Sequence, residues 1–251
     1  MARQRGIIKL EGTIGDMTFY KSKDGHLVRE KGGVSGDKIA NDPNFQRTRE
    51  NGEEFGRAAL AGKVLRTAFR NLLLNSSDVN MVARLTAEMV KVLKADATSI
   101  RGKRNVLDGE LELLTGFDFN NSGKLRGVLY QPYTTDINRV TGNVTINVTP
   151  YTPINAIAAP SGTSHFKFVA AAAEIDFESG AYVIDADESA IIALDPTLQP
   201  ALNIALTLTP NSIKPLFLVF GIVFYQDVNG VKYPLKNGQY NPLNLVQIDG
   251  V

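Results

Sequence analysis

The chain has 251 residues, of which 43% are hydrophobic and 21% charged, a balance typical of a globular protein with a sizeable core. It has no Cys and only two His, so disulfides, thiolate sites and His-rich metal sites are excluded. The net charge of +1 conceals an asymmetry: residues 1–104 carry 20 Lys and Arg against 12 Asp and Glu, whereas residues 105–251 carry 7 against 14.

The first twelve residues, MARQRGIIKLEG, contain no apolar run of the length that a signal peptide needs. The most apolar stretch, PLFLVFGIVFY at 215–225, is far shorter than the roughly 20 residues of a membrane helix. We therefore expect synthesis in the cytoplasm, without a signal peptide or a membrane span.

Short β-prone runs at 7–10, 17–20 and 27–30 are separated by glycines, which predicts an N-terminal β-hairpin. We expect Asp24-Gly25 at the centre of its turn, because both central positions of a two-residue hairpin turn favour positive φ. A hairpin alone is marginal in water and must dock on another surface. We expect it to dock on another copy of the chain. The residues expected to form this assembly interface are Ile14, Met17, Phe19, Tyr20, Leu27 and Val28.

A helical region follows the hairpin. Asp42-Pro43 predicts a helix opening, with Asp42 as the cap and proline at the first helical position. A helical stripe runs from Phe45 to Leu72, and a second helix is predicted within 75–96 with Asp78 as a candidate cap. The two helices should form a helical hairpin.

From about residue 125 onward, β signals dominate. Segments such as VTINVT and LNIALTL alternate strictly between apolar and polar residues, and Asn229-Gly230 is a hairpin signal. KLRGVLYQ, at 124–131, also reads as a strand. Seven or eight strands at this spacing predict an antiparallel β-sandwich. The expected fold is therefore α+β: a β-hairpin and helical hairpin in residues 1–104, followed by an antiparallel β-sandwich in residues 105–251.

No motif for catalysis or cofactor binding stands out, since G-x-S-x-G and phosphate-loop patterns are both missing. Asp185, Asp187 and Glu188 cluster, but without the glycine and distal glutamate of a calcium loop. Asp176 and Glu178 could form a glycosidase-like pair, although this spacing is common by chance. We expect no catalytic residue, no cofactor and no metal.

The basic residues of the first part have three interpretations. They are a solvated helical surface, a nucleic-acid surface, or a surface that meets the acidic part of another copy. Arg101, Lys103 and Arg104 form the densest patch. No helix-turn-helix, zinc or RNA-binding signature accompanies them.

Three segments, at 6–33, 41–56 and 223–246, carry a family resemblance. They read GIIKLEGTIGDMTFYKSKDGHLVREKGG, NDPNFQRTRENGEEFG and VFYQDVNGVKYPLKNGQYNPLNLV. Together they resemble an uncharacterised bacterial protein family with an N-terminal hairpin, a helical middle and a C-terminal β domain. The resemblance implies this domain plan and no activity or site residue.

The sequence thus favours a non-enzymatic structural protein whose partner is itself, assembling into a filament, tube or shell through the N-terminal hairpin. The hairpin would add strands to the exposed sheet edge of a neighbour. Docking of the hairpin within its own chain is the rival interpretation. The alternative function is a carbohydrate- or nucleic-acid-binding module, and a third is a hydrolase using carboxylates near 176–188.

Overall fold

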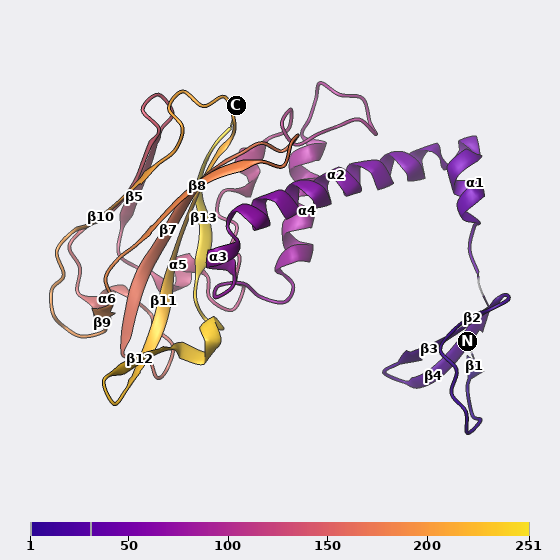
Figure 1. Cartoon of the computed structure of the whole chain (residues 1–251), viewed down its shortest axis with the longest axis horizontal. Coiled ribbons are helices and arrows are strands. Elements are labelled where there is room, and N and C mark those ends of the chain that lie inside the picture. Colours follow the sequence, from indigo (N-terminus) through magenta and orange to yellow (C-terminus); the bar gives the residue numbers. More distant parts are fainter. Residues whose placement is uncertain (1, 31, 251) are drawn as a thin grey trace. The chain divides into compact units, whose positions relative to one another are not determined.

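The computed structural model describes residues 2–30 and 32–250. It divides into two compact units, residues 1–49 and 50–251, which are treated separately below (Figure 1). Helices and antiparallel sheets are both present, so the predicted α+β class is confirmed.

The first unit contains a four-stranded antiparallel sheet in the order β1-β4-β3-β2, and therefore extends beyond the predicted hairpin. The bounds are β1 Ala2–Arg3, β2 Gly12–Ile14, β3 Met17–Ser22 and β4 Gly25–Glu30. The predicted run at 7–10 is wrong as a strand. The side-chain amide of Gln4 instead bonds both the N–H and the carbonyl of Leu10, at 2.9 and 3.1 Å, and so satisfies this loop.

The turn between β3 and β4 lies one residue earlier than predicted. Ser22 pairs with Gly25, so Lys23 and Asp24 occupy the centre. Only Gly25 has a positive φ, 103°, and the Ser22 hydroxyl accepts the N–H of Asp24 at 3.1 Å. Glycine is therefore needed just after the turn, as in loops where a glycine follows a type I turn.

The helical segments begin with the predicted cap. Asp42 accepts the N–H of Asn44 at 2.9 Å, and Pro43 opens the short 3₁₀ helix, as expected. Asp78, in contrast, lies two residues before the cap of its helix, which is Asn80. The helical elements are α1 Gly36–Asn41, η1 Pro43–Phe45, α2 Gln46–Ala68, α3 Arg70–Leu73, α4 Met81–Lys94, η2 Leu111–Leu114, α5 Leu125–Val128, α6 Pro153–Ala156 and η3 Leu235–Gly238. The segment predicted as a strand at 124–131 contains α5, so that prediction is wrong.

The second unit holds two antiparallel sheets. The large sheet has the order β12-β11-β7-β8, with β13 also paired to β11 and β9 to β7, and the small sheet has the order β10-β6-β5. The predicted turn at Asn229-Gly230 connects β11 to β12. The strands are β5 Tyr133–Asn138, β6 Asn143–Val148, β7 His165–Ile175, β8 Tyr182–Glu188, β9 Ile192–Ala193, β10 Leu202–Thr207, β11 Leu216–Val228, β12 Val231–Pro234 and β13 Leu243–Asp249.

The large sheet is the middle of three layers (Figure 1). Along β7, Phe168 and Ala170 face the core shared with the small sheet, whereas Val169 and Ala171 face the core shared with α2 and α4. Strand β11 alternates in the same way. Strands buried on both faces read as continuous apolar runs, which explains why these two segments lack an apolar–polar alternation.

Helix α4 and most of α2 therefore belong to the same unit as the large and small sheets. The structure divides the chain after residue 49, whereas the sequence placed the boundary at 104. The physical reason is that the buried faces of α2 and α4 share one core with β7, β11 and β13. A sequence shows that a helix has an apolar face, but not which surface covers it.

We predict that Gly221→Ala destabilises the second unit. A Cβ at Gly221, in the middle of β11, would lie 2.3 Å from the carbonyl oxygen of Pro242, the residue directly before β13. This oxygen belongs to the backbone, so it can move away only if the chain beside β11 shifts. We expect a loss of about 1–3 kcal/mol in the free energy of unfolding, measured by urea titration with circular dichroism.

The matched control is Gly56→Ala on α2, where a Cβ meets nothing within 4 Å. Alanine has the higher helix propensity, so this variant should gain up to about 1 kcal/mol. Equal effects of the two substitutions would contradict the close packing of β11 on β13.

Candidate functional site

The N-terminal sheet separates the six predicted interface residues onto two faces. Phe19 pairs with Val28, and Met17 pairs with Ile14, so these four side chains share one face. Tyr20 pairs with Leu27 on the other face. The sequence analysis placed all six in one interface, whereas the register brings four of them together.

The two faces differ in chemistry. On the face of Tyr20, the Arg29 guanidinium lies 5.5 Å from the ring centroid, and Thr13 and Thr18 bond each other at 3.4 Å. On the face of Phe19, Ile14 and Met17 are 62% and 52% exposed. Within the first unit, polar neighbours cover the first face, whereas the second face leaves Ile14 and Met17 uncovered.

Nothing in the first unit supplies a core. No described residue of 1–49 is buried, whereas the second unit has two buried clusters. A four-stranded sheet normally needs a covering layer on at least one face. The face that carries Phe19 and Val28 is therefore a candidate contact surface.

The predicted carboxylates have local structural roles. Asp176 pairs with Lys214 and caps the turn by accepting the N–H of Ser179 at 3.1 Å. The hydrogen bond from Lys214 and those from Ser179 hold the pKa of Asp176 well below its usual range. Asp185 accepts the N–H of Thr207 at 2.7 Å. No metal-suited cluster of three or more His, Asp or Glu occurs in residues 2–30 and 32–250.

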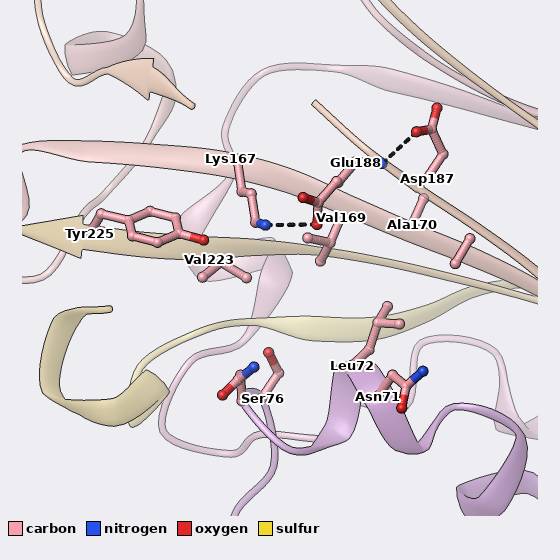
Figure 2. A pocket seen from close by; sticks show the side chains of 12 residues that line it. Asn71, Leu72, Ser76, Lys167, Val169, Ala170, Asp187, Glu188, Val223 and Tyr225 are labelled. Carbon is pink, nitrogen blue, oxygen red and sulfur yellow. Dashed lines mark hydrogen bonds and ion pairs between the residues drawn. The ribbon is translucent and has the colours of Figure 1, made fainter. Parts of the chain in front are cut away.

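Glu188 belongs to a cavity of about 340 Å³ beside β7, β8 and β11 (Figure 2). Lys167 Nζ lies 2.7 Å from Glu188 Oε2 and 5.9 Å from the centroid of the Tyr225 ring. Burial alone would lower the pKa of Lys167, but the hydrogen bonds and charges of Glu188 and Tyr225 outweigh it and raise that pKa. This lysine is held protonated, the opposite of what a general base requires.

A second cluster of charged residues anchors the loop after α4. Asp96 is 2% exposed and accepts four hydrogen bonds, from Thr98 N and Oγ1, Ser99 N and Asn105 N. Buried Glu54 accepts the N–H of Gly102 at 2.8 Å. The loop has no regular secondary structure, yet its backbone is fixed at both ends.

Arg57 completes this anchor from α2. Its guanidinium donates to the carbonyl oxygens of Arg104, at 2.7 Å, and Gly102. The sequence analysis singled out Arg101, Lys103 and Arg104 but missed the groups that hold them. Asp96 followed by Thr98 is a local turn signal that could have been noticed, whereas the contacts of Glu54 and Arg57 span 45 or more residues.

We predict that Asp96→Asn destabilises the protein at neutral pH. Burial alone would raise the pKa of Asp96, but its hydrogen bonds outweigh burial and hold that pKa well below the ordinary value of 3.8. An amide loses the charge and presents N–H to N–H donors, so the expected cost is roughly 2–3 kcal/mol by urea unfolding.

The depressed pKa also sets a pH dependence. The stability that Asp96 contributes is complete above 3.8 and is lost as pH falls through its folded-state pKa. The difference between wild type and Asp96→Asn should therefore shrink below that pH. Exposed Asp108→Asn serves as the control, with a change within about 0.5 kcal/mol. A pH-independent difference would refute the role given to the Asp96 charge.

No family model matches the chain, and no curated protein is similar to it at a significant level. Among solved structures, the human F-spondin reeler domain aligns with 48% of this chain and 91% of that one, at 11% identity and a TM-score of 0.19. A likeness this weak carries no argument about fold or function. In the part of the chain that the structure describes, no helix has the length and apolar character that crossing a bilayer requires.

Proposed function

We propose that this chain is a non-enzymatic structural protein that assembles with further copies of itself through its N-terminal sheet. The observation that carries the proposal is a sheet with an apolar face and no buried side chain among the described residues of 1–49. Contact with a second copy would bury Ile14, Met17, Phe19 and Val28. Each fully buried side chain of this size contributes about 1.5–3 kcal/mol.

The acceptor that fits best is β8 of another copy. Within the described sheets this strand pairs with β7 alone, and six of its seven residues are exposed. Tyr182, Val183 and Ile184 form an exposed apolar run on it. These exposed apolar side chains can pack on the apolar face that Phe19 and Val28 share in another copy.

Charge adds nothing to this contact, because Arg3 and Arg29 lie on the face of Tyr20 and not on the face of Phe19. The assembly would be head-to-tail, since a different surface is used on each copy. Such contacts give rings or open filaments, according to whether the rotation closes.

We predict that Phe19→Asp weakens self-association. A carboxylate on the apolar face would have to be desolvated in the contact, so the association constant should fall by at least about tenfold. Sedimentation velocity over a range of protein concentrations measures this directly.

Thr18→Asp provides the control, because it places the same carboxylate in the same strand but on the opposite face. Both variants place an aspartate in β3, so they introduce the same unfavourable strand residue. Thr18→Asp should leave association close to that of the wild type. A wild-type protein that stays monomeric at every concentration, or equal effects of the two variants, would refute the proposal.

A further inference from the structure

We propose that the cavity beside the anchored loop at 95–105 binds single-stranded nucleic acid. The arginines Arg101 and Arg104 would contact phosphate, and Phe55 would stack on a base. This site lies wholly in the second unit and uses none of the residues proposed for self-association. The test of this site therefore does not depend on whether the protein self-associates.

The cavity has a volume of about 480 Å³ and is formed by three elements. Helix α2 supplies Phe55, helix α4 supplies Val90 and Lys94, and the loop supplies Arg101 and Arg104. Residues 55 and 104 are far apart in the sequence, so the fold, and not the local pattern, brings an aromatic ring and three cations to one place.

The loop is organised before any ligand arrives. Asp96, Glu54 and Arg57 fix its backbone through Gly102, Asn105 and their neighbours. None of these contacts uses the guanidinium of Arg104 or the ammonium of Lys94. A loop whose backbone is already fixed loses less conformational entropy when a ligand binds, which favours a ligand site here.

Arg104 is the central cation of the site. Its Nε is buried and has no hydrogen-bond partner among the described residues. Arg101 is partly engaged, because it donates to Asn51 Oδ1 at 2.8 Å and lies 3.7 Å from Glu50 Oε2. The guanidinium fork suits phosphate, which can satisfy several donors at once.

A carboxylate also lines the cavity. Glu54 is 5% exposed, and its Oε1 accepts the N–H of Gly102. Glu50, whose carboxylate lies 3.7 Å from Arg101, is a second carboxylate nearby. The cations Lys94, Arg101 and Arg104 still outnumber these two carboxylates, which favours an anionic ligand.

Phe55 distinguishes a nucleic acid from a simple anion. The ring is 60% exposed on α2 and belongs to neither buried cluster. Single-strand binding sites combine a basic groove with exposed aromatic rings on which bases stack, and this cavity has both. The exposed Lys103, between the two arginines in sequence, is suited to a neighbouring phosphate.

The test is fluorescence anisotropy of the full chain with a labelled oligothymidylate of about 20 nucleotides, at salt concentrations from about 50 to 200 mM. Arg104→Gln and Lys94→Gln should each weaken binding and reduce the slope of log K against log salt by about 0.7, the value for one phosphate contact on a single strand. Phe55→Ala should weaken binding by at least about fivefold and leave the slope unchanged.

Lys63→Gln is the control, since this exposed lysine lies on α2 but not at the cavity. It should leave affinity and slope unchanged. Circular dichroism melting establishes that each variant is folded. Lys94 is exposed at the end of α4, so Lys94→Gln should fold and can test the site even if Arg104→Gln unfolds.

Three results would overturn the inference. The first is an oligonucleotide that does not bind, and the second is Phe55→Ala with wild-type affinity, which would leave an anion site only. The third is Arg104→Gln that alters sedimentation of the protein without altering oligonucleotide binding. That result would make the cavity a contact for the acidic surface of another copy.

Discussion

Burial of both faces of β7 and β11 is the constraint on which the second unit depends. These strands carry apolar residues at successive positions, so each face must be covered. The small sheet covers one face and the helices α2 and α4 cover the other, which produces three layers from residues 50–251. The small side chains of Ala170 to Ala173 are buried between these layers, and Gly221 lets β13 lie against β11. Helices α2 and α4, which the sequence predicted as a hairpin apart from the sheets, therefore share the core on one face of the large sheet.

The sheet of the first unit, in contrast, has an apolar face that no other described layer of that unit covers. Its sheet has a register that gathers Ile14, Met17, Phe19 and Val28 on one face, and no described residue there is buried. Folding of the second unit needs none of these residues, because both of its buried clusters come from residue 58 onward. The contrast between a completed core and an uncovered sheet is the physical basis of the proposed self-assembly.

The anchored loop beside α4 is a separate feature. Buried Asp96 and Glu54 hold its backbone, while the cations at its surface are left for other contacts.

The sequence predicted much of this architecture from local signals. The Asp42-Pro43 opening and the Asn229-Gly230 hairpin are confirmed, because caps and turns depend on neighbouring residues alone. Three features were beyond local reasoning. The run at 7–10 fails as a strand because Gln4 bonds its backbone, the segment at 124–131 turns helical in its middle, and the helices pack on the sheet instead of forming their own domain. For the candidate interface, the alternation of Phe19 with Tyr20 was predictable, but the pairing of Met17 with Ile14 requires the sheet register. The anchor of the loop joins Glu54 to Gly102, and no short-range pattern reveals such a contact.

The central claim is that the apolar face of the N-terminal sheet is covered by another copy. Hydrogen–deuterium exchange of residues 12–30, followed across protein concentration, tests it most directly. The account predicts that backbone N–H groups of β3 and β4 exchange rapidly in dilute protein and become protected as concentration rises, while those of β7 and β11 stay protected throughout. Protection of β3 and β4 that is the same at every concentration would contradict it.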